Sequence, residues 1–329
     1  MKRLMSSFLL AVTATCALAA GARTAHADRH VLLILDLTGS MSASSAGGMA
    51  RIDVAKAQLK AVVQAVPAPG TEYALWTFES NTFTRVFSFT DPKTTTDLEN
   101  AINAASLGGS TPLAHTVCAA VDELFNYKPN VFADKVIELA TDGEENNTAP
   151  LDQCFGPPSA TKWPTLDVNS WQWKVRNKAC TGSPGSPGPC NNPTGSSSLS
   201  LIINVYHLFD FISFRGVPTN LEAGPKTRSI SGSGAQTLSA SDDAAFFAGL
   251  ASVTHGRYSA ITLATPLAQA FPVPGDANSD GCVNVADRAL VLQQFGTAGS
   301  ADLNHDGVVN TFDLQTVLQN FGRGCTAVP

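Results

Sequence analysis

The sequence lacks the features that mark several large classes of protein. Only 15% of its 329 residues are charged, and 21 Lys and Arg are outnumbered by 27 Asp and Glu. A chain without an excess of positive charge is a poor partner for nucleic acid or for an anionic membrane surface. The seven cysteines include no C-x-x-C pair, so the spacing typical of a zinc site is missing. We therefore expect neither nucleic-acid binding nor a structural zinc ion.

Long apolar runs are also missing. The run from Phe8 to Ala20 is too short to span a bilayer, and no later segment is long enough. It follows Lys2 and Arg3 and precedes an A-x-A pattern at residues 25–27, as in a secretory signal peptide. We therefore expect residues 1–27 to be a signal peptide, no transmembrane segment, and a mature chain that is secreted, extracellular or at the cell surface.

Removal of residues 1–27 changes the charge and the cysteine count. It deletes Lys2, Arg3 and Arg23 from the basic residues and no acidic residue, which leaves a net charge of −9. Cys16 is lost too, unless it carries a lipid, for which the preceding TAT is a poor signal. Six cysteines remain, an even number typical of disulfides in an exported chain. Of fifteen conceivable pairings, we expect sequence neighbours to pair: Cys118 with Cys154, Cys180 with Cys190, and Cys282 with Cys325.

From residue 29 to about residue 264, apolar strand-like runs alternate with segments of helical periodicity. This alternation predicts an α/β fold with a doubly wound, mainly parallel sheet flanked by helices. The run HVLLILD at residues 30–36 is apolar on both faces, as a central parallel strand is. We expect further strands at residues 72–80, 84–89, 135–143, 199–209 and 256–261, and helices at residues 51–66, 94–106, 112–127 and 241–256.

A long excursion at residues 144–198 interrupts this pattern. Its high content of Pro, Gly and Ser is typical of a surface loop, so we expect a loop insertion. Connections of this length are uncommon unless they are functional or disordered. The insertion carries Trp163, Trp171 and Trp173. We favour a local hydrophobic cluster because large aromatic side chains are usually buried, and a platform for a ligand such as a polysaccharide is the alternative.

Oxygen-bearing side chains gather where ligands bind in open α/β sheets, at the carboxyl ends of the strands. They are Asp36, Thr38 and Ser40 after the first strand, Thr111 in a loop that enters a helix, and Asp142 at the end of the strand at 135–143. Two carboxylates with neutral hydroxyls suit Mg²⁺ and leave the ion able to accept a carboxylate oxygen from a partner. The alternative is that these side chains only cap local turns and helices.

These five residues resemble the metal-ion-dependent adhesion site of von Willebrand factor A domains. The D-x-S-x-S motif of that family corresponds to residues 36–40, its separate threonine to Thr111 and its later aspartate to Asp142, with Thr38 where serine is usual. The resemblance implies an A domain at residues 28–264 and a Mg²⁺ or Mn²⁺ ion that binds an acidic group of a protein ligand. It also implies that Ser40 and Thr111 hold the metal directly, and Asp36 and Asp142 directly or through water.

A metal-dependent enzyme would need a general base or nucleophile beside the ion. His115 is a candidate, but Leu113 and Val117 define the buried face of its predicted helix, which places His115 nearly opposite, in solvent. We recognise no catalytic constellation and expect a binding protein, not an enzyme. A metal-dependent hydrolase or a scaffold-associated polysaccharide-degrading component is the competing hypothesis, and metal sites that serve only stability are a third.

One segment is repeated near the C-terminus with a period of 26 residues. The copies are DANSDGCVNVADRALVLQQFG from residue 276 and DLNHDGVVNTFDLQTVLQNFG from residue 302. Gly281 and Gly307 stand at position six, where a calcium loop turns sharply, and position seven offers a backbone carbonyl. The spacing predicts two Ca²⁺ loops, the first with Asp276, Asn278, Asp280, Cys282, Asn284 and Asp287, and the second with Asp302, Asn304, Asp306, Val308, Asn310 and Asp313.

Each loop is followed by one predicted helix, and position twelve is aspartate instead of the glutamate of EF-hands. This pattern resembles dockerin type I modules. The resemblance implies a small all-α, calcium-folded module at residues 275–325, joined by a linker at residues 265–274, that docks onto a cohesin-like or cell-surface partner. The residues before position twelve differ between the copies, Val285-Ala286 and Thr311-Phe312, so we do not expect two equivalent docking modes.

Overall fold

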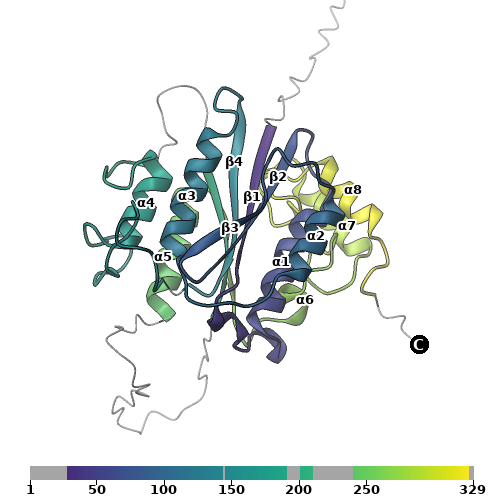
Figure 1. Ribbon diagram of the computed structural model, residues 1–329. Helices are drawn as coiled ribbons and strands as arrows, with labels where there is room; N and C mark the ends of the chain where they lie inside the picture. Colours follow the sequence, from purple (N-terminus) through teal and green to yellow (C-terminus); the bar gives the residue numbers. More distant parts are fainter. Residues whose placement is uncertain (1–27, 144, 191–200, 210–239, 326–329) are drawn as a thin grey trace, which may run out of the picture.

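The computed structural model describes residues 28–143, 145–190, 201–209 and 240–325, and in these ranges a central sheet lies between two layers of helices (Figure 1). The predicted signal peptide lies outside the described residues. The sheet order is β3-β2-β1-β4-β5-β6, and every neighbouring pair is parallel except β2 and β3. The strands are β1 (Asp28–Asp36), β2 (Thr71–Glu79), β3 (Thr82–Phe87), β4 (Ala133–Thr141), β5 (Leu201–Leu208) and β6 (Tyr258–Ile261).

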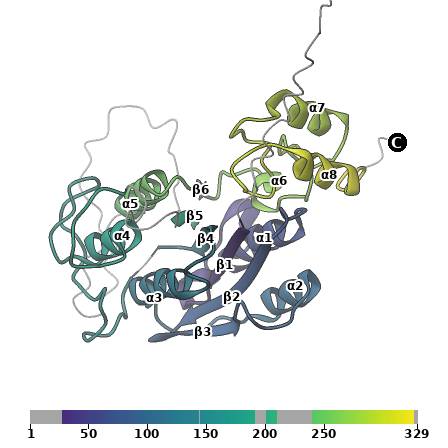
Figure 2. The ribbon, with the colours of Figure 1, turned by 90° about the horizontal axis from the view of Figure 1, so that it is seen from above.

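The side chains of β1 alternate between two hydrophobic cores, as the two-residue period of a strand requires. Leu32 and Ile34 belong to the core under one helical layer, and Leu33 and Leu35 to the core under the other. Figure 2 shows the two layers on opposite faces of the sheet. One layer contains α1 (Arg51–Gln64) and α2 (Thr95–Ala104), and the other α3 (Leu113–Asn126), α4 (Trp171–Thr181) and α5 (Ala240–Val253). The predicted α/β class is therefore confirmed.

Helix α4 corrects the prediction that residues 144–198 are only a loop. Ser170 caps its N-terminus by accepting a hydrogen bond from the Trp173 N–H, and Gly182 ends it with a φ of 76°. Trp171 is buried and packs edge to face on Phe246 with ring centroids 5.1 Å apart. Residues 144 and 191–198 of the predicted insertion lie outside the described residues.

Trp163 and Trp171 form the predicted hydrophobic cluster, which Trp173 does not join. Trp163 is partly buried and also meets Phe246, with ring centroids 6.3 Å apart. Two disulfides, Cys118–Cys154 and Cys180–Cys190, tie the insertion to α3 and to itself. The insertion is therefore a packed part of the domain, because its buried aromatic side chains belong to the domain's hydrophobic core. Its high Pro and Gly content does not reveal this packing in the sequence.

The C-terminal segment contains α7 (Val285–Gln294) and α8 (Thr311–Gln319), one helix after each repeat, and the disulfide Cys282–Cys325. Val283, Val291, Val309 and Val317 form a small core of their own. In Figures 1 and 2 this segment lies on the α1 side of the sheet.

The predicted linker at residues 265–274 is not a free tether. It contains α6 (Leu267–Ala270), and Ala270 is buried in the core under α1. The Gln58 amide of α1 donates hydrogen bonds to the Gln269 and Ala270 carbonyls at 2.7 and 3.0 Å. Because these contacts fix the connection, the C-terminal segment is held against the N-terminal domain.

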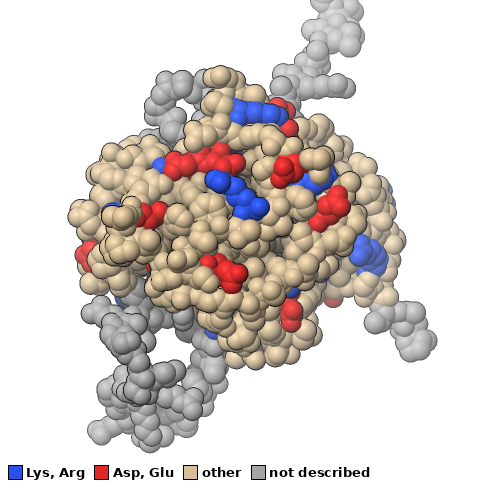
Figure 3. Space-filling model, in the orientation of Figure 1, with Lys and Arg blue, Asp and Glu red and all other residues tan. Residues whose placement is uncertain are grey.

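The surface agrees with the low charge of the sequence. On the face seen in Figure 3, basic and acidic side chains are sparse and interspersed, and no continuous basic patch is visible. No helix in the described part of the chain has the length and apolar character that crossing a membrane requires.

Candidate metal site in the N-terminal domain

Asp36 ends β1 and is fully buried beside the end of β4. Its Oδ1 accepts a hydrogen bond from the Thr38 N–H at 2.8 Å, and its Oδ2 accepts one from the Thr141 hydroxyl at 2.7 Å. The carboxylate is therefore fixed between the loop that follows its own strand and the neighbouring strand.

The two hydroxyl residues of the motif lie together in the turn that follows. Thr38 precedes the short 3-10 helix Gly39–Ser42 and does not cap it with its side chain. Its Oγ1 is 3.1 Å from the Ser40 Oγ. The absence of this cap weighs against the interpretation that the hydroxyls serve only as helix caps.

The loop that carries Thr111 lies directly against this turn. The Gly39 N–H donates to the Gly109 carbonyl at 3.0 Å, and the Gly108 N–H donates to the Leu37 carbonyl at 2.6 Å. Thr111 is buried, and its N–H donates to the Asn146 side chain at 2.9 Å. The structure thus brings together the three segments that carry Asp36, Thr111 and Asp142.

Asp142 forms a buried ion pair that the sequence analysis missed. Its Oδ2 lies 2.8 Å from Nη1 of Arg51, the first residue of α1, and both side chains are at most 10% exposed. The other carboxylate oxygen, Oδ1, is buried and has no hydrogen-bond partner in the described structure. A charged residue with one unsatisfied buried oxygen is costly unless a further group binds there.

The electrostatics of the pair fit a cation. Burial, followed by the charge of Asp142, raises the pKa of Asp36 to about 7. Asp36 thus lies close enough to Asp142 for the two buried carboxylates to repel each other, and Arg51 is paired with Asp142. The unsatisfied Asp142 Oδ1 and the neighbouring hydroxyls are hard oxygen donors of the kind that Mg²⁺ and Mn²⁺ accept.

His207 of β5 supports the end of β4 as a neutral side chain. Burial lowers its pKa to about 4, and its Nε2 is 3.3 Å from the Asp142 carbonyl. Gly143 adopts a φ of 92°, and a Cβ there would lie 2.8 Å from the His207 Nε2. The position after Asp142 therefore requires glycine, because the backbone has a positive φ and a Cβ would clash with His207.

His115 is not the solvent-facing side chain that helical periodicity predicted. It is only 29% exposed, its Nδ1 is hydrogen-bonded to the Asp152 carboxylate, and its ring lies 5.1 Å from that of Phe83. The prediction was wrong because the insertion folds back over α3 through the Cys118–Cys154 disulfide.

Residues 31–144 match the family model described as von Willebrand factor type A domain. These residues make up about a third of the chain and are similar to a von Willebrand factor A domain. We call residues 28–264 the A domain. The match spans the segments that carry Asp36, Thr111 and Asp142, and it agrees with the mostly parallel sheet between helices. No protein of curated function matches the sequence.

Several solved structures resemble the chain distantly. An aerotolerance-related membrane protein from Bacteroides fragilis is 14% identical with a TM-score of 0.43, over 73% of this chain and 94% of that one. The vWF domain of the type V pili tip protein Mfa5 from Porphyromonas gingivalis is 22% identical with a TM-score of 0.30, over 36% and 39%. Proximal thread matrix protein 1 from the mussel byssus, with a zinc-occupied MIDAS motif, is 21% identical with a TM-score of 0.30, over 39% and 31%.

Outside the A domain, the two C-terminal repeats share one hydrogen-bond pattern. Asp276 accepts bonds from the N–H groups of Asp280 and Gly281, and Asp302 accepts the equivalent bonds 26 residues later. Gly281 and Gly307 have φ values of 89° and 91°, as a sharp turn at position six requires. Both segments therefore adopt the same turn conformation.

The last two predicted side-chain ligands of each loop also have structural roles. Asn284 and Asn310 cap α7 and α8, and each forms a capping box with the aspartate three residues later. These aspartates, Asp287 and Asp313, are fully buried. Burial raises the pKa of Asp313 to about 6, in part with the charge of Asp302, so this loop too would accept a cation.

The predicted sites do not consist of acidic side chains alone. No three or more His, Cys, Asp or Glu side chains of the described residues converge into a group that could hold a metal ion. A cation at Asp36 and Asp142 would rely on hydroxyls, and cations in the C-terminal loops on Asn amides and backbone carbonyls, for their remaining oxygen ligands.

Proposed function

We propose that this protein is an exported binding protein that recognises a partner through a divalent cation. Mg²⁺ or Mn²⁺ at the von Willebrand A site would take an acidic group of a protein ligand. Five residues would hold the ion: Asp36, Thr38, Ser40, Thr111 and Asp142. The observation that carries the proposal is the buried Asp142 Oδ1, which lacks a hydrogen-bond partner beside a second buried carboxylate.

The charge of the site supports recognition of an acidic group. Asp36 and Asp142 contribute two negative charges when ionised, and Arg51 contributes one positive charge. A divalent cation would make this set net positive, so a carboxylate from a partner would be attracted to it. The bound ion would supply an electrophilic position, while the residues of the chain orient it.

The C-terminal repeats support a second element of the proposal. Two Ca²⁺ ions would occupy the loops at residues 276–287 and 302–313, and the folded module would attach the protein to a cohesin-like or cell-surface partner. The duplicated hydrogen bonds and the Cys282–Cys325 disulfide support such a module. Export is supported by the signal-like residues 1–27 and by three disulfides, which persist in oxidising compartments.

Calorimetric titration of the mature chain with Mn²⁺ in the presence of excess Ca²⁺ tests the A-domain site. We expect one Mn²⁺ to bind the wild type and none to bind Asp36→Asn. The matched control is Asp53→Asn, which removes an equal charge from an exposed position of α1 and leaves the site intact. Equal Mn²⁺ binding by Asp36→Asn and the wild type would refute the metal site.

Affinity capture from secreted and surface fractions of the source organism tests the partner. In Mg²⁺ plus Ca²⁺, we expect a partner that is retained by Asp53→Asn and lost by Asp36→Asn. The combined Asp276→Ala and Asp302→Ala variant should lose a different partner, bound by the C-terminal module. Substrate turnover that disappears with Asp36→Asn would instead favour the metal-dependent hydrolase.

A further inference from the structure

The two C-terminal loops share most of their internal hydrogen bonds but have different surroundings. Asn278 and Asp280 of the first loop are exposed, and among the described residues no hydrogen bond or ion pair joins its predicted side-chain ligands to residues 28–264. In the second loop, Asp302 and Asn304 are buried against the A domain. The repeat is therefore symmetric inside the module and asymmetric at its surface.

Arg257, which precedes β6, forms an ion pair and a hydrogen bond with the first residue of the second loop. Its Nη2 lies 2.7 Å from the Asp302 Oδ2, and its Nη1 donates to the Asp302 carbonyl at 3.0 Å. Inside the loop, the Asp302 Oδ1 accepts the Asp306 N–H and the Oδ2 also accepts the Gly307 N–H. The same carboxylate thus bonds both to the loop interior and to the A domain.

The side chain of Asn304 likewise bonds both inside the loop and to the A domain. Its Oδ1 accepts the Asp306 N–H, and its Nδ2 donates to the Val66 carbonyl at 3.0 Å, just beyond α1. Arg29 of β1 donates to the carbonyls of Asn304 and His305 at 3.1 and 2.5 Å. Two predicted ion ligands of the second loop are therefore also its contacts with the A domain.

The A domain carries buried charges that face this loop. Arg29 is 2% exposed and Glu138, in the centre of β4, is 1% exposed in its side chain. The His305 Nδ1 lies 3.5 Å from a Glu138 oxygen, and the Tyr206 hydroxyl donates to Glu138 at 3.1 Å. Buried charges are costly without partners, and the second loop supplies partners for both Arg29 and Glu138.

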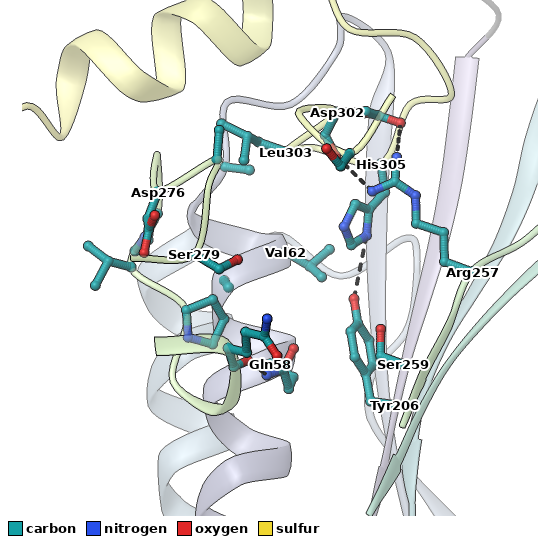
Figure 4. Close-up of a pocket in the computed structure, with 18 of the residues that line it drawn as sticks. Gln58, Val62, Tyr206, Arg257, Ser259, Asp276, Ser279, Asp302, Leu303 and His305 are labelled. Carbon is teal, nitrogen blue, oxygen red and sulfur yellow. Dashed lines mark hydrogen bonds and ion pairs between the residues drawn. The ribbon is translucent and has the colours of Figure 1, made fainter. Parts of the chain in front are cut away.

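The contact is polar and incompletely filled. Figure 4 shows a cavity between α1, β5, β6 and the module, into which Gln58, Tyr206, Ser259 and Ser279 project. Its volume is about 360 Å³. The module's apolar core is separate from the cores of the A domain. Docking therefore depends on the polar geometry of the second loop more than on a shared hydrophobic core.

We propose that the second calcium loop is an intramolecular latch: ion binding to this loop and its docking on the A domain stabilise each other. The inference rests on the proposed calcium binding and adds that only the second loop is coupled to the A domain. Coupling of two equilibria is reciprocal, so a contact that orders Asp302 and Asn304 strengthens ion binding, and the bound ion strengthens docking. The first loop binds its ion independently of docking.

The direction in which one substitution changes the Ca²⁺ affinity of the second loop distinguishes the latch from simple electrostatics. Arg257→Gln removes a positive charge next to Asp302. Charge alone predicts that calcium binds the second loop more tightly after this change, because a repulsive cation is gone. The latch predicts weaker binding, because the docked geometry of the loop is lost.

The experiment is a calorimetric Ca²⁺ titration of the full mature chain carrying Asp276→Asn, so that only the second loop binds. Adding Arg257→Gln should raise the Kd by about 5- to 150-fold, the usual range of such coupling. Adding Arg288→Gln, which removes an exposed charge from α7, should leave the Kd unchanged. In an Asp302→Asn chain, which reports the first loop, Arg257→Gln should have no effect. An unchanged or lower Kd at the second loop would overturn the latch.

Hydrogen exchange provides a readout that needs no substitution of Arg257. In the Asp276→Asn chain, Ca²⁺ should slow amide exchange in β5, β6 and residues 64–66, and it should not do so in Asp302→Asn. Protection confined to residues 275–325 in both variants would overturn the latch. Absence of Ca²⁺ binding by either loop would refute the proposed function as well, whereas binding without coupling would refute the latch alone.

Discussion

At the scale of single residues, Arg51 adds a positive charge to the proposed metal site. A cation in the first turn of a helix opposes the helix dipole, so its position suggests a specific anionic partner. That partner is Asp142, 2.8 Å away and buried. The sequence contained this signal, but only the fold shows that the start of α1 lies beside the end of β4.

Replacing Arg51 by Gln should make the stability of the domain depend on divalent ions. Without metal, Asp142 would be a buried carboxylate without its counter-ion, and we expect a loss of about 3–5 kcal/mol in the free energy of unfolding. Mg²⁺ should recover much of this loss, so the Mg²⁺-induced rise in Tm should exceed that of the wild type. Thermal unfolding in EDTA and in Mg²⁺ measures both values. Arg51→Lys is the control that keeps the charge, and equal losses in the two conditions would contradict the prediction.

The raised pKa of Asp36 predicts a pH dependence with opposite signs for stability and metal binding. The folded-state pKa is about 7, above the ordinary value of 3.8, so the fold binds a proton that the unfolded chain releases. In EDTA, this group should contribute stability that is full below pH 4 and is lost as the pH rises through 7. Mn²⁺ competes with that proton, so its affinity should fall by up to about tenfold per pH unit below pH 7.

Two measurements check this prediction. Urea unfolding in EDTA between pH 5 and pH 8 should show the stability loss in the wild type and a smaller loss in Asp36→Asn, which cannot titrate at this position. Mn²⁺ titrations of the wild type at the same pH values should show the opposite trend. A Mn²⁺ affinity independent of pH over this range would contradict the assignment of Asp36 as a ligand.

At the scale of elements, the sequence predicted most of the sheet because its strands are short apolar runs between glycines and polar turns. The run at residues 30–36 became the centre of the sheet, and the predicted helices at 51–66 and 112–127 are α1 and α3 within a few residues. Helix α4 was missed although Ser170 and Gly182 are ordinary helix-boundary residues. The Pro and Gly density around it dominated the composition of the segment, and its packing partner Phe246 is distant in the sequence.

Truncation of Trp171 tests whether α4 belongs to the core. Trp171 is 2% exposed, so Trp171→Ala should lower the free energy of unfolding by about 3–5 kcal/mol through lost burial and a cavity. Trp173 lies two residues away on the same helix and is only half-buried, so Trp173→Ala should cost clearly less. Urea denaturation of both variants gives the comparison. Equal, small losses would mean that the insertion is peripheral to the folding unit.

At the scale of the whole molecule, the sequence predicted two modules and a linker but could not show that they dock. Residues 265–274 were predicted to be a linker, whereas Ala270 is buried and its carbonyl accepts a hydrogen bond from Gln58. The polar contacts of Arg29, Glu138 and Arg257 join residues far apart in the chain, and nothing in their local sequence marks them. Patterns along the chain report helices, strands and repeats, whereas contacts between modules depend on tertiary geometry.

Calorimetric unfolding of the full chain should report whether the two modules act as one unit. With Ca²⁺, we expect the A domain and the C-terminal module to unfold in a single transition, because the docked second loop supplies partners for charges buried in the sheet. In EDTA, the module should unfold separately, and the A-domain transition should move to lower temperature as Arg29 and Glu138 lose those partners. Asp276→Asn should preserve the single transition in Ca²⁺, and Asp302→Asn should split it. An A-domain Tm that is the same in Ca²⁺ and EDTA would show that the modules unfold independently. If the second loop and the A domain are coupled, Ca²⁺ binding to the loop must also raise the free energy of unfolding of the A domain.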